Sequence, residues 1–250
     1  MASLPFRTAL ARLADVCWPR PCAVRSCGRP VDRPGRHVCS ACLARLPFHV
    51  GGGACRICAR TIPSGAARAF VCEDCARHPP AYDLARSAIR FEPPFDDLIK
   101  SFKYGRALWL RPDLADLLEG AVRAKLDAAA VDVVVPVPLH PHRLRSRGYN
   151  QSALLASDLA ARIGRRCDET SLARVRETGH QARLHASERK NNLDGAFAVT
   201  ENEFIRRRTV LLVDDVMTTG ATLSECAAIL KRAGAVRVWC VTVARSVADK

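Results

Sequence analysis

The sequence lacks any apolar run approaching the roughly 18 residues needed to cross a bilayer. Residues 1–21 (MASLPFRTALARLADVCWPRP) contain scattered arginines and no continuous apolar stretch of the kind found in secretion signals. Aromatic residues make up only 6% of the chain, which leaves few rings for stacking on nucleic-acid bases. These absences predict a cytoplasmic protein without a transmembrane segment.

Acidic residues are also scarce. The chain has 25 Asp and Glu against 39 Lys and Arg, and its formal net charge is +14. This excess favours polyanionic partners such as nucleic acid, pyrophosphate or a membrane surface, although a genome rich in G and C also favours arginine. The 250 residues, 48% of them hydrophobic, are enough for one α/β domain with a packed core and a smaller appendage.

Cysteine, in contrast, is abundant and clustered. Two thiolates of one turn can bind the same ion, so closely spaced cysteine pairs predict structural Zn²⁺ sites. Nine of the twelve cysteines precede residue 80, and eight of them form four pairs: Cys22/Cys27, Cys39/Cys42, Cys55/Cys58 and Cys72/Cys75. We expect two structural zinc ions, because a disulfide framework is the weaker alternative without a secretion signal. The other four cysteines, Cys17, Cys167, Cys226 and Cys240, have no partner at ligand spacing and are interpreted as ordinary residues.

Two pairings of these cysteines are possible. Sequential use of neighbouring pairs gives a double zinc ribbon, whereas alternating use gives a cross-brace. We favour the sequential arrangement because residues 45–53 have the composition of a linker between two similar units. The first unit departs from the usual spacing, with four residues between Cys22 and Cys27. Eight thiolates and two zinc ions together would lower the net charge from +14 to about +10, and the metal would supply much of this module's folding free energy.

The chain is expected to divide into an N-terminal helical lead (1–20), a double zinc ribbon (21–80) and an α/β domain (81–250), with a boundary at Pro79-Pro80. In the last part, apolar patterning predicts strands over 85–91, 131–138 and 236–244. The same patterning predicts helices over 95–102, 114–126, 152–163 and 221–232. Their alternation indicates an α/β fold with a parallel sheet of about five strands.

The most informative stretch is 210–222 (VLLVDDVMTTGAT). An apolar strand runs into Asp214 and Asp215, and a turn of small residues (Thr218, Thr219, Gly220, Ala221, Thr222) then opens a helix. Such a turn presents backbone N–H and side-chain O–H donors to a phosphate, and the helix dipole adds to the attraction. The adjacent carboxylates suit sugar hydroxyls or a Mg²⁺ ion that itself holds a diphosphate.

This stretch resembles the fingerprint of type I phosphoribosyltransferases, which bind phosphoribosyl pyrophosphate (PRPP). The resemblance implies that Asp214 and Asp215 occupy the catalytic position on the ribose. It also implies that the turn of five residues holds the 5′-phosphate, and that Mg²⁺ accompanies PRPP.

A second basic stretch follows the strand at 131–138. Arg143, Arg145 and Arg147 are expected in a loop at the carboxyl end of that strand, where ligands bind in open α/β sheets. Arginines there can neutralise a departing pyrophosphate, and a solvated basic loop is the alternative. Lys103, with Lys100 and Arg106, is a further candidate that faces either a phosphate or water.

Nearly the whole chain resembles the ComF family. The shared features are the cysteine ribbon, the Phe-Lys-Tyr-Gly element at 102–105, the Pro-Val-Pro strand end at 136–138, the Arg-x-Arg-Gly-Tyr-Asn-Gln run at 145–151 and the PRPP motif. That family contains competence proteins for DNA uptake. The resemblance also implies a mobile lid over PRPP, for which Gln181, Arg189 and Asn192 are candidates.

The resulting hypothesis is a PRPP- or nucleotide-binding protein that handles single-stranded DNA during natural transformation, in contact with DNA-uptake machinery at the inner membrane. The alternative is a genuine phosphoribosyltransferase of nucleotide salvage or biosynthesis that releases pyrophosphate. A regulator that senses PRPP without chemistry is a third class. Glutamine-dependent ammonia transfer is not expected, because the sequence begins Met1-Ala2-Ser3 without the N-terminal cysteine nucleophile of a glutaminase.

Overall fold

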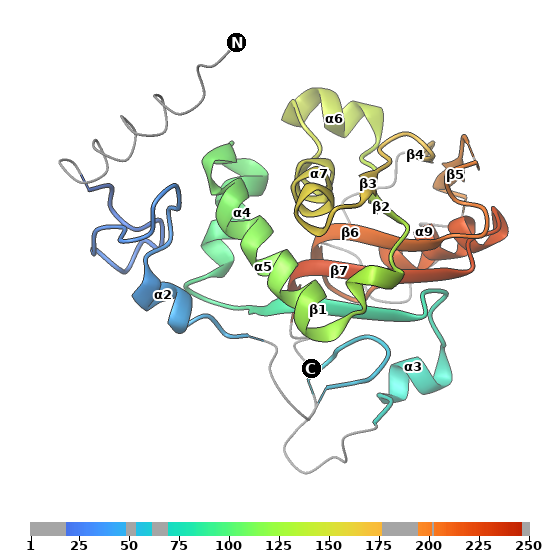
Figure 1. Ribbon diagram of the computed structural model, residues 1–250, viewed down its shortest axis with the longest axis horizontal. Coiled ribbons are helices and arrows are strands. Elements are labelled where there is room, and N and C mark those ends of the chain that lie inside the picture. The colour runs from blue at the N-terminus through green and yellow to red at the C-terminus, as the bar shows by residue number, and fades with distance from the viewer. Residues whose placement is uncertain (1–18, 49–53, 62–69, 177–194, 202, 247–250) are drawn as a thin grey trace. The chain divides into compact units, whose positions relative to one another are not determined.

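A computed structural model describes residues 19–48, 54–61, 70–176, 195–201 and 203–246 (Figure 1). The chain forms two compact units. The first unit contains Met1–Pro47 and Glu92–Leu114, and the second contains Phe48–Phe91 and Ala115–Lys250. The four cysteines from Cys22 to Cys42 thus belong to the first unit and the four from Cys55 to Cys75 to the second. The boundaries expected at residues 20 and 80 remain a prediction.

The second unit is built on a five-stranded parallel sheet in the order β1-β7-β6-β2-β3. Its strands are β1 (Leu84–Phe91), β2 (Val133–Pro136), β3 (Arg166–Cys167), β6 (Thr209–Met217) and β7 (Arg237–Ser246). The first five residues of β6 are all buried, as expected for a strand covered on both faces. The expected α/β fold with a five-stranded parallel sheet is confirmed, with β1 at one edge.

Helices α7 (Gln151–Ile163) and α9 (Ala221–Arg232) connect these strands. The chain crosses from β2 to β3 through α7 and from β6 to β7 through α9, and these crossovers run in opposite directions along the sheet. Because parallel crossovers are right-handed, the two helices cover opposite faces of the sheet. The direction reverses between the adjacent strands β2 and β6, which is where open α/β sheets bind ligands.

Several short elements complete the second unit: α3 (Glu73–Arg77), η2 (Ala128–Ala130), α6 (Pro141–Arg147) and an antiparallel pair of strands, β4 (Leu172–Arg174) and β5 (Phe197–Val199). The sequence patterns did not predict β3, β4 or β5, which have two or three residues each and so show no periodicity. The buried core of this unit includes Cys55, Cys58, Cys72 and Cys75 together with Tyr82, Met217 and Leu223.

The first unit contains α2 (Ser40–Ala44), α4 (Asp96–Tyr104), η1 (Leu108–Leu110) and the start of α5 (Arg111–Lys125), a helix whose later residues belong to the second unit. An ion pair between Lys100 and Asp96, one turn apart, supports α4, which ends at Gly105. Among the described residues, no helix combines the length and apolar character that a membrane span requires.

One expected loop is a helix. Arg143, Arg145 and Arg147 lie in α6, which His140 caps, Pro141 opens and Gly148 ends in the left-handed region. The expectation was wrong because these start and stop signals enclose only seven residues, too few for an apolar stripe to reveal a helix. In a helix, Arg143 and Arg147 share a face that excludes Arg145. Arg145 is exposed, whereas the other two arginines are half-buried.

Candidate functional site

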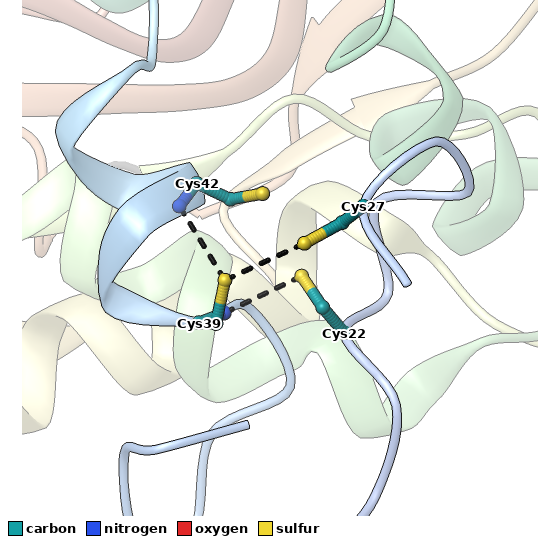
Figure 2. Close-up of side chains that lie close together, drawn as sticks. All are labelled: Cys22, Cys27, Cys39 and Cys42. Atoms are coloured by element: carbon teal, nitrogen blue, oxygen red, sulfur yellow. Dashed lines mark hydrogen bonds between the residues drawn. The ribbon is translucent and has the colours of Figure 1, made fainter. Parts of the chain in front are cut away.

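The first cysteine group consists of Cys22, Cys27, Cys39 and Cys42. Figure 2 shows their sulfur atoms directed toward a common centre, and all four lie within 4.8 Å of one another. The Cys27 and Cys39 sulfurs are 3.7 Å apart, far longer than a disulfide bond of about 2 Å. A tetrahedral zinc ion with Zn–S bonds of about 2.3 Å requires an S–S edge of about 3.8 Å. The group therefore fits a zinc ion.

The second cysteine group consists of Cys55, Cys58, Cys72 and Cys75, and it is fully buried. Its Cys58 and Cys72 sulfurs are also 3.7 Å apart, so it satisfies the same tetrahedral test. Neighbouring pairs of cysteines share each group, as the sequential arrangement predicted and a cross-brace did not. The two groups are compatible with a double zinc ribbon.

Backbone N–H groups point at the sulfurs of both groups. The Cys39 amide donates to Cys22 Sγ at 3.4 Å, and the Cys72 amide donates to Cys55 Sγ at 3.3 Å. Burial raises the pKa of Cys58 to about 11. A hydrogen bond from the backbone N–H of Arg29 lowers the pKa of Cys27 to about 7. Metal binding must displace protons from the thiols whose pKa is raised.

A buried carboxylate supports the first cysteine group from α5. Asp113 is 5% exposed, and its two oxygens accept the backbone N–H groups of His37 at 2.9 Å and Val38 at 3.2 Å. Arg33 lies 3.5 Å from the same carboxylate. These bonds fix the backbone that leads into Cys39. The sequence did not reveal this role, because an acidic residue in the first turn of a helix is also explained by the helix dipole.

The turn from β6 into α9 provides the features expected of a phosphate site. Thr218 and Thr219 are exposed, and Gly220 is the N-cap residue with φ of 84°. Thr219 Oγ1 accepts the Ala221 N–H at 3.3 Å. The N–H groups of the first turn of this 12-residue helix have no carbonyl partner within the helix, so together with the hydroxyls they suit an anion.

Gly220 fits closely in that turn. A Cβ atom at this position would lie 2.5 Å from Met217 Cε and 3.1 Å from the Tyr82 hydroxyl. The positive φ therefore favours glycine, and a Cβ would also force the Met217 methyl group, the end of a flexible side chain, to move. The sequence pattern predicted a glycine turn but not the two side chains beneath it, which lie 3 and 138 residues away along the chain.

The acidic pair lies inside β6 rather than after it. Successive side chains of a strand point to opposite faces, so Asp214 and Asp215 do not lie side by side. Asp214 Oδ1 accepts a hydrogen bond from Ser152 Oγ of α7 at 2.7 Å. Asp215 is 2% exposed, and its Oδ1 accepts the Val216 N–H at 2.7 Å. The catalytic role expected of the pair stays a prediction.

Ser152 is a site residue that the sequence patterns did not single out. It lies in the first turn of α7, where the Asn150 side chain caps the helix by accepting the Ser152 N–H. Asn150 also donates to the carbonyl of Val137 at 3.1 Å, which links the helix start to the residue that follows β2. The helix itself was predicted over 152–163, and the N-cap asparagine explains why it begins here.

The arginines of α6 follow β2, the strand beside β6, so they leave the sheet at the same carboxyl edge as the Thr218–Gly220 turn. Arg147 donates to the Gln151 side chain at 2.5 Å. Lys103 lies near the end of α4 in the first unit. PRPP binding by Lys103 and the α6 arginines stays a prediction. The lid candidates Gln181, Arg189 and Asn192 lie outside the described residues.

Comparison with known proteins gives consistent matches. The sequence profile of the phosphoribosyl transferase domain matches residues 150–250. Competence protein F of Haemophilus influenzae is 37% identical over 175 residues, which cover 67% of this chain and 76% of the relative. DNA utilization protein YhgH of Salmonella typhi is 34% identical over 217 residues, covering 80% and 94%. Competence protein ComFC of Bacillus subtilis is 26% identical over 222 residues, covering 86% of each chain.

Proposed function

The chain belongs to the ComF family, and from that premise we propose that it binds Mg²⁺-PRPP at the turn between β6 and α9 and handles single-stranded DNA during natural transformation. The observation that carries the PRPP part is the meeting of a helix N-terminus, two exposed threonine hydroxyls and the half-buried Asp214 at the switch point of the sheet. Mg²⁺ would balance the charge of the pyrophosphate, and the carboxylates or the phosphates would hold it.

Different residues of this site would contact different parts of PRPP. The α9 N-terminus and the hydroxyls of Thr218 and Thr219 would hold the 5′-phosphate, and Asp214, oriented by Ser152, would accept hydrogen bonds from the ribose hydroxyls. The α6 arginines would stabilise the charge that pyrophosphate gains if it leaves the sugar.

The DNA part is supported by a surface of the first unit on which exposed rings accompany basic residues. Tyr104 is 72% exposed and Trp109 is 49% exposed, values that are unusual for aromatic side chains. The His37 ring lies 4.8 Å from the Trp109 ring, and Arg20 contacts His37 at 2.8 Å. Rings beside cations are the elements with which proteins bind single strands through stacking and phosphate contacts.

The relatives named for competence and for DNA utilization support the same assignment. Cytoplasmic location, and contact with DNA-uptake machinery at the inner membrane, follow from the proposal because an incoming strand enters at that membrane. Single-strand binding through phosphates should weaken with salt, with a log–log slope of about −0.7 per phosphate engaged.

The test combines two titrations of the zinc-loaded, full-length protein. Mg²⁺-PRPP binding is measured by calorimetry on the parent and on Asp214→Asn, for which we expect a loss of about 1–3 kcal/mol. Oligonucleotide binding is measured in a salt series on the parent and on Trp109→Ala and Tyr104→Ala. Each ring variant should weaken binding by about fivefold or more, because a stacked base contributes about 1–3 kcal/mol. Phe48→Ala is the matched control, since Phe48 is an exposed ring (37%) of the second unit.

The outcomes separate the candidate functions. PRPP binding without any single-strand binding at low salt would move the assignment to a phosphoribosyltransferase of salvage or biosynthesis, which pyrophosphate release with a defined acceptor would establish. If Phe48→Ala weakens the binding of single-stranded DNA as much as Trp109→Ala does, the first unit does not carry the DNA-binding surface. PRPP affinity that Asp214→Asn leaves unchanged would show that the β6–α9 motif is a structural turn.

A further inference from the structure

Arg245, near the end of β7, is a buried arginine of the second unit. It is 3% exposed, and its Nη1 donates to the Cys58 carbonyl at 2.7 Å and to Met217 Sδ at 2.9 Å. Within the described parts of the chain, no carboxylate lies within ion-pair distance of it, and its Nε has no hydrogen-bond partner. A guanidinium remains charged under all conditions in a protein, so this position holds a buried positive charge.

A buried charge without an opposite charge costs several kcal/mol. The second cysteine group adjoins this charge, since Cys58 belongs to that group and its carbonyl accepts the Arg245 bond. Four thiolates with one Zn²⁺ carry a net charge of −2. The metal-loaded group is therefore a counter-charge for Arg245, and Arg245 is an outer-shell partner of that group.

The same guanidinium also contacts a residue that packs against the Thr218–Gly220 turn, called the phosphate turn below. Met217 Sδ accepts from Arg245, and Met217 Cε occupies the space directly beneath Gly220, at 2.5 Å from where a Cβ would be. Arg245 thus contacts both a residue of the second cysteine group and the methionine that packs against Gly220, the N-cap residue of α9. The first cysteine group belongs to the other unit and has no part in these contacts.

We propose that Arg245 is a positioning residue that couples the metal of the second cysteine group to the PRPP turn, so that this metal must be bound for the turn to hold its high-affinity geometry. This inference rests on the proposed PRPP site. Loss of the metal removes the counter-charge of Arg245, and the guanidinium then moves away from Met217 to find water or another acceptor. Since Gly220 packs on Met217, the N–H groups of the first turn of α9 shift with it. Thermodynamic linkage requires the converse, that bound PRPP retains the metal.

Arg245→Met removes the charge and keeps the length of the apolar stem, and Arg245→Lys keeps the charge without the planar fork. Arg86→Met is the matched control. Arg86 is half-buried and donates to the Arg56 and Ala85 carbonyls. Burial lowers its pKa, and the negative charges of the Cys55 and Cys58 thiolates oppose that shift. It therefore lies in the field of the second cysteine group but makes no bond to Met217.

The experiment measures two quantities on each full-length variant after its folding has been checked by circular dichroism. The first is the rate at which a coloured chelator removes each zinc ion, with and without saturating Mg²⁺-PRPP. The second is the Kd of Mg²⁺-PRPP by calorimetry. For Arg245→Met we expect one zinc ion to be lost about tenfold faster and PRPP to bind about fivefold to tenfold more weakly. Arg245→Lys should be intermediate, and Arg86→Met should leave the Kd unchanged.

In the parent, PRPP should slow the loss of one zinc ion of the two. Parent protein that fails to bind PRPP would refute the proposed function, and the coupling with it. If the parent binds PRPP and both Arg245→Met and Arg245→Lys bind it with the same Kd, the proposed function stands and the coupling is overturned. Equal weakening in Arg86→Met would also overturn it, because the effect would then be one of charge near the metal and not of the Met217 contact.

Discussion

Replacing Gly220 by alanine tests whether the phosphate turn is packed as the structure shows. The substitution places a Cβ at φ of 84°, a left-handed conformation that costs an L-residue about 1–2 kcal/mol. That Cβ would also lie 2.5 Å from Met217 Cε, and because this atom ends a flexible side chain that can move, the overpacking adds only about 1 kcal/mol. We therefore expect Gly220→Ala to lower the free energy of unfolding by about 2–3 kcal/mol.

Two other glycines of the second unit separate these contributions. Gly148 has nearly the same φ, 86°, but nothing lies within 4 Å of its Cβ position, so Gly148→Ala should cost only the conformational part of about 1–2 kcal/mol. Gly120 lies in α5 with open space around it, and Gly120→Ala should stabilise the protein by roughly 0.5–1 kcal/mol.

The assay is equilibrium unfolding in urea of the zinc-loaded protein, with the midpoint and the slope fitted separately. A change of midpoint at constant slope reports stability alone. If Gly220→Ala is no less stable than Gly148→Ala, then Met217 and Tyr82 do not pack beneath the turn. Close packing would then not explain the glycine at this position, and only its positive φ would.

Other predictions concern metal content, the ribose site and pH. Elemental analysis of the parent should give two zinc ions, and Asp113→Ala should speed the loss of one of them to a chelator, because the backbone leading into the first cysteine group loses its acceptor. Ser152→Ala should weaken Mg²⁺-PRPP binding by about tenfold in calorimetry, and an unchanged Kd would mean that Asp214 needs no partner on α7. Burial, with the nearby Arg86, lowers the pKa of Lys125 from its ordinary 10.5 to about 8. Between these values the unfolded state binds more protons, so stability should rise with pH across that window, and Lys125→Met should flatten the rise in urea unfolding.

Much of the fold follows from local sequence patterns. The apolar runs around Val134 and Leu212 predict buried strands because both faces of a central parallel strand are covered, and the structure confirms them in a five-stranded parallel sheet. Cysteine spacing likewise predicted the four pairs, because two ligands of one turn meet whatever surrounds them, and the linker composition of residues 45–53 favoured the sequential groups that the structure confirms. The short helix α6 escaped prediction, since seven residues contain too little periodicity.

The sequence by itself therefore determined the longer strands and helices, the cysteine pairs and the glycine turn with its acidic neighbours, since each depends on residues a few positions apart. Tertiary structure alone decided the strand order that places the switch point between β2 and β6. It also decided that Ser152 contacts Asp214. Arg245 likewise contacts Cys58, 187 residues away along the chain, and Met217, 28 residues away. Such contacts arise from the folding of the whole sheet, because a hydrogen bond or a buried charge has no periodicity along the chain from which it can be predicted.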